Sequence, residues 1–223
     1  MAYGNRATYR AKGLHAAAIL FLKKGYSNTT MKEIAKCAGI DYNALNRTFK
    51  VKENVLAELV ERVLEDQFRI TREFIADKTD DPILYYAAET TLQLHMAEVG
   101  ENIRDLYAAA YSLPITTKII QDTITVKLEG IFKAHLPGLE SKDFYEREIA
   151  SGGIMRGFMT IPCDRYFTME RKVAAFLESS LKIYDVPKEK IQEAIEFVSQ
   201  FDFETIAKQT VPSMLESLEG RTE

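Results

Sequence analysis

The chain has 223 residues, 46% of them hydrophobic and 28% charged, which is the composition of an ordinary globular protein with one or two domains. Its longest uninterrupted apolar run, residues 16–22, is too short to cross a membrane, and the polar, basic start lacks a signal-peptide pattern, so we expect a cytoplasmic protein. The net charge of −4 is unevenly spread: residues 1–53 carry ten basic and three acidic residues, whereas residues 54–223 carry 19 basic and 30 acidic ones. A net charge of +7 on residues 1–53, followed by an acidic remainder, favours binding to a polyanion. A chance imbalance of surface charge explains this distribution equally well.

Apolar residues recur with the period of an α-helix along almost the whole chain, and no segment alternates like a β-strand. The pattern first predicts four helices, at residues 14–22, 31–38, 41–47 and 52–76, and Gly25 and Gly39 end the first two. After a break at residues 80–82 it predicts further helices near residues 84–95, 103–111, 115–136, 150–161, 173–184, 191–198 and 203–218. The sequence therefore predicts an all-α fold.

The segment between residues 25 and 53 combines two short helices with a tight turn. Thr30 and Glu33 have the spacing of a capping box, in which each side chain satisfies a backbone amide at the start of the second helix. Gly39 permits the left-handed backbone of a sharp turn after that helix. A capped helix start can also receive a phosphate group.

The third predicted helix follows this turn at once. Asp41 is placed to cap it, and Leu45 and Phe49, four residues apart, are expected to anchor it inward. The residues left on its outer side are Tyr42, Asn43, Ala44, Asn46 and Arg47. Two helices joined in this way predict a helix-turn-helix, whose second helix enters the major groove of DNA.

Residues 10–60 resemble the DNA-binding domain of the TetR family of bacterial regulators. The residues that match the family pattern at fixed spacing are Leu14, Ala16, Ala17, Leu20, Phe21, Gly25, Tyr26, Thr29, Thr30, Ile34, Ala35, Ala38, Gly39, Leu45, Phe49, Lys52 and Glu53. The chain departs from the pattern at Gly13, which replaces a usual Ile and is expected to weaken the first helix, and at Asp41, Asn43 and Asn46. At position 46 the family usually has a Tyr that holds a phosphate, so the contact made by the shorter Asn46 is open.

The resemblance implies two sets of DNA-binding residues. Thr29, Thr30 and Lys52 are expected to contact phosphates. The expected groove-facing set is Tyr42, Asn43, Asn46 and Arg47. The alternative is that some of these side chains are only solvated surface. The resemblance also implies a division into a DNA-binding domain at residues 1–53 and a helical ligand-binding and dimerisation domain at residues 54–223.

Small residues point to a dimer interface in the second part of the chain. Gly153 and Gly157 lie four apart on an apolar stripe with Phe158 beside them, so a partner helix could approach closely. Packing inside one chain is the alternative. We expect the helix to join two copies of the chain in a homodimer.

A ligand pocket is predicted around His95, Tyr107 and Tyr111, which interrupt apolar stripes with polar groups that need partners. A satisfied core histidine and packed tyrosines are the alternative. The abundant tyrosine, phenylalanine and methionine would suit an apolar or aromatic effector, but equally an ordinary core.

These features together predict a ligand-responsive transcriptional regulator, a repressor that binds a pseudo-palindromic operator as a dimer. One rival is a chromosome-binding protein of the same fold that recruits a partner and senses no small molecule. The other rival is an enzyme, but no phosphate loop, paired metal-ligand spacing or nucleophile elbow is present. Three scattered histidines and the separate Cys37 and Cys163 lead us to expect no metal site, no cofactor and no disulfide framework.

Overall fold

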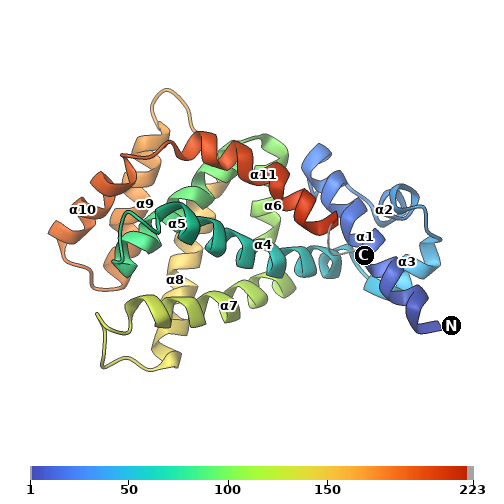
Figure 1. Cartoon of the computed structure of the whole chain (residues 1–223), viewed down its shortest axis with the longest axis horizontal. Coiled ribbons are helices and arrows are strands. Elements are labelled where there is room, and N and C mark those ends of the chain that lie inside the picture. Colours follow the sequence, from blue (N-terminus) through green and yellow to red (C-terminus); the bar gives the residue numbers. More distant parts are fainter. Residues whose placement is uncertain (1, 220–223) are drawn as a thin grey trace.

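A computed structural model describes the backbone of residues 2–219 and the side chains of residues 7–213, and within these limits the protein consists of eleven helices and no strand. The all-α prediction is thus confirmed. Three helices form a head at one end of the molecule, namely α1 (Ala2–Lys24), α2 (Met31–Ala38) and α3 (Tyr42–Phe49). The remaining helices form the body: α4 (Lys52–Ile75), α5 (Pro82–Glu98), α6 (Glu101–Ala110), α7 (Pro114–Phe132), α8 (Ser141–Thr160), α9 (Met169–Ile183), α10 (Lys188–Val198) and α11 (Phe203–Glu219) (Figure 1).

Local capping fixes the short helices of the head. The Thr30 hydroxyl accepts the Glu33 amide at 3.3 Å, and the Glu33 carboxylate accepts the Thr30 amide at 2.9 Å, as a capping box requires. Gly39 closes α2 with a φ of 63°, in the left-handed region. Asp41 caps α3 by accepting the amides of Asn43 and Ala44 at 3.0 and 3.1 Å. The expected caps and turn are therefore confirmed, and they determine where α3 points.

Gly13 has a role that the sequence did not indicate. The helix that contains it is not interrupted there, because α1 runs unbroken from Ala2 to Lys24. A Cβ atom at position 13 would lie 2.8 Å from the Leu45 side chain and 2.9 Å from the Phe49 ring. The missing side chain therefore lets α3 press its two buried anchors against α1, and the expected weakening of the helix start stays a prediction.

The head is joined to the body through three helices. α4 leaves the head and continues into the body, so the expected boundary at residue 53 falls in its first turn. The Asp105 carboxylate of α6 accepts the Ser27 amide at 2.8 Å and the Ser27 hydroxyl at 2.6 Å, and the Asn102 amide donates to the Lys23 carbonyl at 2.7 Å. The C-terminal α11 packs along α5 and reaches α1 (Figure 1). Movements of α6 or α11 can therefore be passed to the head.

The body is built around α5, whose residues are nearly all buried. The rings of Phe132 and Tyr184 stack with centroids 4.2 Å apart, and the Tyr86 ring meets both edge-on. None of the helices in the described part of the chain is long and apolar enough to span a membrane. The core thus consists of one helix wrapped by the other helices of the body.

Candidate functional site

The outer face of α3 carries the predicted groove-facing residues. Tyr42, Asn43, Asn46 and Arg47 are all exposed, whereas Leu45 is fully buried on the opposite side together with Phe49. Residues three and four positions apart are neighbours on a helix surface, so Asn46 lies beside both Tyr42 and Asn43, and Arg47 lies beside Asn43, in one continuous surface. The Asp41 carboxylate, the one acidic group here, is engaged by two amides at the start of α3. This surface offers hydrogen-bond donors and one cation, as base edges and phosphates require.

All three predicted phosphate contacts are engaged within the head. The Thr29 side chain is 1% exposed, and its hydroxyl donates to the Gly25 carbonyl at 2.7 Å. The Lys52 ammonium donates to the carbonyls of Tyr26 and Thr29 at 2.7 and 2.8 Å and lies 4.0 Å from the centre of the Tyr26 ring. Thr30 is exposed at the start of α2, but its hydroxyl donates to the Glu33 carboxylate at 2.8 Å, so each of the three side chains would have to leave its partner to reach a phosphate.

The position of Lys52 leads to a prediction about stability. Replacing it with methionine (Lys52→Met) removes the ammonium that donates to the Tyr26 and Thr29 carbonyls, and the Tyr26 carbonyl keeps only the Thr29 amide, so we expect a loss of about 1–3 kcal/mol in unfolding free energy. Urea unfolding at a fixed protein concentration measures this, and the exposed Lys36→Met on α2 is the control. A variant as stable as the control would contradict the structural role. The salt dependence of DNA binding separates the two roles, because a lost phosphate contact reduces its slope by about one unit.

The three residues of the predicted ligand pocket border three different cavities. His95 lines a pocket of about 390 Å³ between α5, α9, α10 and α11. Tyr107 lines an apolar cavity of about 90 Å³ between α1, α4 and α6, which Val211 of α11 also borders. Tyr111 lines a core void of about 30 Å³, large enough for little more than water. The structure therefore does not bring the three side chains together.

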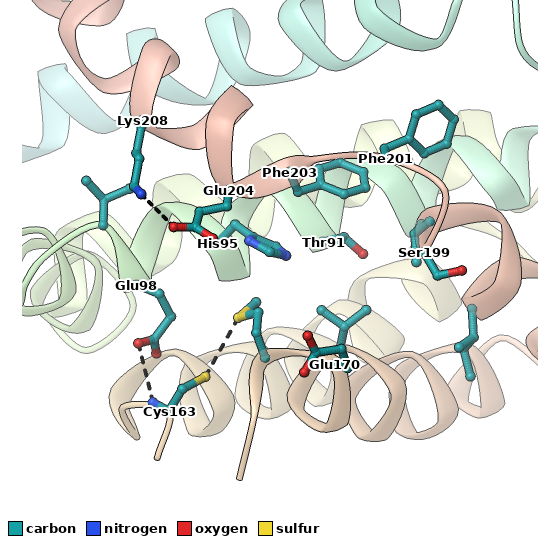
Figure 2. A pocket seen from close by; sticks show the side chains of 15 residues that line it. Thr91, His95, Glu98, Cys163, Glu170, Ser199, Phe201, Phe203, Glu204 and Lys208 are labelled. Atoms are coloured by element: carbon teal, nitrogen blue, oxygen red, sulfur yellow. Dashed lines mark hydrogen bonds and ion pairs between the residues drawn. The ribbon is translucent and has the colours of Figure 1, made fainter. Parts of the chain in front are cut away.

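The cavity beside His95, called here the His95 pocket, has a volume within the range of ligand sites. Its apolar walls come from Val173, Ile195, Val198, Phe201 and Phe203. The imidazole of His95 stacks on the Phe203 ring with centroids 5.7 Å apart, and burial lowers the pKa of His95. Figure 2 shows Thr91 and His95 beside the pocket, with Glu170 across from them and Glu204 next to His95.

The two tyrosines belong instead to a buried polar network. The Tyr111 hydroxyl donates to Gln93 at 3.0 Å, and the Tyr107 hydroxyl lies 3.4 Å from the Gln67 amide oxygen. Gln67 and Gln93 both donate to one carboxylate oxygen of Glu89, at 2.8 and 2.6 Å. The predicted polar partners of the tyrosines are thus present, at the centre of the body.

Two carboxyl groups at this centre were not identified from the sequence. Glu89 is 2% exposed and Glu148 is 3% exposed, and both border the core void. Burial raises the pKa of Glu89 to about 7 and the pKa of Glu148 to about 8. The available signal for Glu89 was a single acidic residue in residues 83–97, which contain no other Asp, Glu, Lys or Arg, whereas Glu148 lies in a segment without an apolar stripe.

The predicted dimer helix α8 turns its glycines outward. Gly153 and Gly157 are exposed, and a Cβ atom at either position would meet nothing within 4 Å. Ile149, one turn before Gly153, is 49% exposed. Phe158 packs inside the chain, with its ring centroid 5.9 Å from that of Phe176. The glycine stripe is therefore not used for packing between helices of one chain.

Comparisons with known proteins agree with this geometry. Residues 14–59 match the sequence model of "Bacterial regulatory proteins, tetR family". The HTH-type transcriptional repressor KstR2 of Rhodococcus jostii (strain RHA1) is 35% identical over 82 residues, which is 37% of this chain and 40% of that protein. The chain thus aligns with less than half of this relative.

A solved structure shares the fold over a longer stretch. The SmeT–triclosan complex superimposes with a TM-score of 0.52 at 22% identity, covering 81% of this chain and 95% of the other. At this level of identity the likeness concerns the fold alone. The head therefore matches a known DNA-binding domain, and the body shares an architecture rather than a recognisable site.

Proposed function

We propose that the chain is a ligand-responsive repressor of the TetR family that binds a pseudo-palindromic operator as a homodimer, since its N-terminal segment matches that family's model and a repressor of the same kind. The observation that carries the proposal is the exposed face of Tyr42, Asn43, Asn46 and Arg47 on a helix held rigidly by its caps. The +7 charge of residues 1–53 adds an electrostatic attraction to DNA that does not depend on sequence. In this proposal Thr29, Thr30 and Lys52 contact the phosphates that flank the groove, after each has exchanged its partner within the head for a phosphate oxygen.

The experiment that tests this is the sequencing of genomic fragments retained by the purified protein. A repressor of one operon is expected to retain one or a few fragments that share a two-fold symmetric site with half-sites about 34 Å apart. Dozens of unrelated fragments would favour the rival, a chromosome-binding protein of the same fold. Absence of any retained fragment would contradict both.

Arg47 supplies a prediction about specificity. Its guanidinium is exposed on the outer face of α3, where it can donate two hydrogen bonds to a guanine. We expect Arg47→Ala to cost about 1–3 kcal/mol of binding on the retained fragment and much less on random DNA. Fluorescence anisotropy with both duplexes measures the difference. Equal losses on the two would show that Arg47 contributes charge and does not read sequence.

We place the effector in the His95 pocket. Its volume of about 390 Å³ supports this choice, because the cavities at Tyr107 and Tyr111 are too small for an organic ligand without rearrangement. Tyr107 and Tyr111 then act in the network between the pocket helix α5 and the head-facing helix α6. An effector that weakens DNA binding by a given factor is itself weakened by DNA by the same factor.

A further inference from the structure

Thr91 presents an unsatisfied hydroxyl to the His95 pocket. Its side chain is 1% exposed, and its Oγ has no hydrogen-bond partner within the described part of the chain. The neighbouring Thr90 shows the usual alternative, because its hydroxyl donates to the Tyr86 carbonyl of its own helix at 2.8 Å. A buried polar atom without a hydrogen-bond partner costs free energy. Beside a cavity of ligand size, such an atom indicates that a polar group of a ligand completes the hydrogen bond.

His95 lies one helical turn after Thr91 on the same side of α5, as Figure 2 shows. Its ring is held against Phe203 and faces the same space. Together the hydroxyl and the imidazole form a short polar strip that can both donate and accept a hydrogen bond. The surrounding walls are aliphatic and aromatic, so the strip fixes orientation while the walls bind an apolar body.

The charges around the pocket disfavour an anionic ligand. Glu98 is paired with Lys172 at 2.5 Å and with Arg104 at 3.0 Å, and Glu204 is paired with Lys208 at 2.5 Å. Glu170 has no ion-pair partner among the described residues, and hydrogen bonding from Thr168 lowers its pKa. The pocket thus presents an uncompensated carboxylate and no uncompensated lysine or arginine.

We propose that the His95 pocket binds an uncharged, largely apolar molecule that carries one hydroxyl group, and that Thr91 and His95 recognise that hydroxyl. This deepens the proposed function by naming the chemical class of the effector. The binding step itself does not depend on the protein being a repressor.

α11 connects this pocket to the head. Phe203, Glu204 and Lys208 at its start line the pocket, and Val211, one turn later, borders the cavity that Ala18 and Leu22 of α1 also line. A ligand that displaces the start of α11 therefore acts on α1 without passing through the core. The same helix both contacts the ligand and touches the DNA-binding domain.

Calorimetry with three matched probes tests the ligand class. β-Naphthol carries the hydroxyl, β-methylnaphthalene replaces it with a methyl group of similar size, and β-naphthoate carries a negative charge. We expect β-naphthol to bind the full-length protein about tenfold more tightly than β-methylnaphthalene, because only the hydroxyl satisfies Thr91. β-Naphthoate is expected not to bind. Equal affinities for the first two probes, or preferred binding of β-naphthoate, would overturn the proposal.

Substitutions test whether the Thr91 hydroxyl recognises the hydroxyl of the ligand. Thr91→Val keeps the shape and removes the unsatisfied hydroxyl, so we expect an unchanged or higher melting temperature and an affinity for β-naphthol about tenfold lower, with β-methylnaphthalene unaffected. Thr71→Val is the matched control, since its hydroxyl is equally buried and unpartnered but lies outside the pocket. It should leave both affinities unchanged. A Thr91→Val protein that is destabilised and still prefers β-naphthol would show a purely structural role.

Operator release is measured separately, on a retained genomic fragment. Release by saturating β-naphthol supports the route through α11, and retention of the fragment under saturation overturns that route. Failure to retain any fragment overturns the proposed function, while the calorimetric result on free protein still decides the ligand class.

Discussion

In urea unfolding at a fixed protein concentration, the protein is expected to lose stability as the pH rises from about 4.5 to about 8. The groups responsible are Glu89 and Glu148, whose pKa values burial raises from 4.5 to about 7 and about 8. Each folded carboxyl keeps its proton over a range in which the unfolded chain releases it. The stabilisation is therefore complete below pH 4.5 and is lost as the pH rises through the folded pKa values.

The size of the effect follows from the pKa difference. For Glu89 the shift from 4.5 to about 7 corresponds to about 3 kcal/mol, lost between pH 4.5 and roughly 7.5. The physical cause is desolvation, which two hydrogen bonds from Gln67 and Gln93 offset only in part. Neither carboxyl has a lysine or arginine partner among the described residues. Ionising Glu89 therefore places an uncompensated charge in the core.

The variant Glu89→Gln isolates this contribution. The amide keeps the shape and cannot ionise, so at pH 5 the variant should be about as stable as the natural protein, and at pH 8 it should be more stable by about 3 kcal/mol. The exposed Glu178→Gln on α9 is the control and should follow the natural protein at every pH. Parallel curves for the natural protein and Glu89→Gln would mean that Glu89 does not carry the pH dependence.

The head could be predicted in detail because the forces that shape it are local. A capping box spans four residues, a left-handed turn needs one glycine, and Leu45 and Phe49 are four apart on one helix. Each of these features can be read from a short stretch of sequence, and the exposed face of α3 follows from them except at Ala44, which was expected on the outer side and is buried. The packing role of Gly13 could not be predicted, because it lies in a contact with side chains more than thirty positions away.

The body could be predicted only as a set of helices. Periodicity identifies which side of a helix is buried, but not which other helix covers it. His95, Tyr107 and Tyr111 all lie on buried stripes, yet they border three cavities because α5 and α6 meet different neighbours along their lengths. The same reasoning missed Thr91, since its significance depends on a pocket formed with α9, α10 and α11.

The coupling between the head and the body has a physical basis. Hydrogen bonds from α6 and packing from α11 link the head to the body, so the orientation of α3 depends on the state of the body. The links are few, and those to Ser27 and Lys23 are exposed to water. In the proposed function, a ligand that binds one state of the body more tightly than the other would therefore shift the head.

The outward-facing glycines of α8 lead to a prediction about assembly. Gly153→Leu adds a large side chain where the single chain has open space, so the fold should be retained, and helix propensity should favour the variant by several tenths of a kcal/mol. If a partner helix packs on this stripe, the leucine prevents the close approach. We expect the variant to sediment as a folded monomer at concentrations where the natural protein is a dimer.

Loss of the dimer should weaken operator binding far more than any single contact on α3. Two linked heads gain about 10²–10⁴ in affinity over one head, because the second binds from a high effective concentration. Gly130→Leu is the matched control: it also adds a leucine to open space on a helix, but on α7 at the side that faces α4 and α5. Analytical ultracentrifugation and anisotropy on the same samples make the comparison. A Gly153→Leu protein that remains a dimer and binds the operator fully would place the dimer interface on another surface. A monomer with the DNA affinity of a single head would assign the interface to the stripe of Ile149, Gly153 and Gly157.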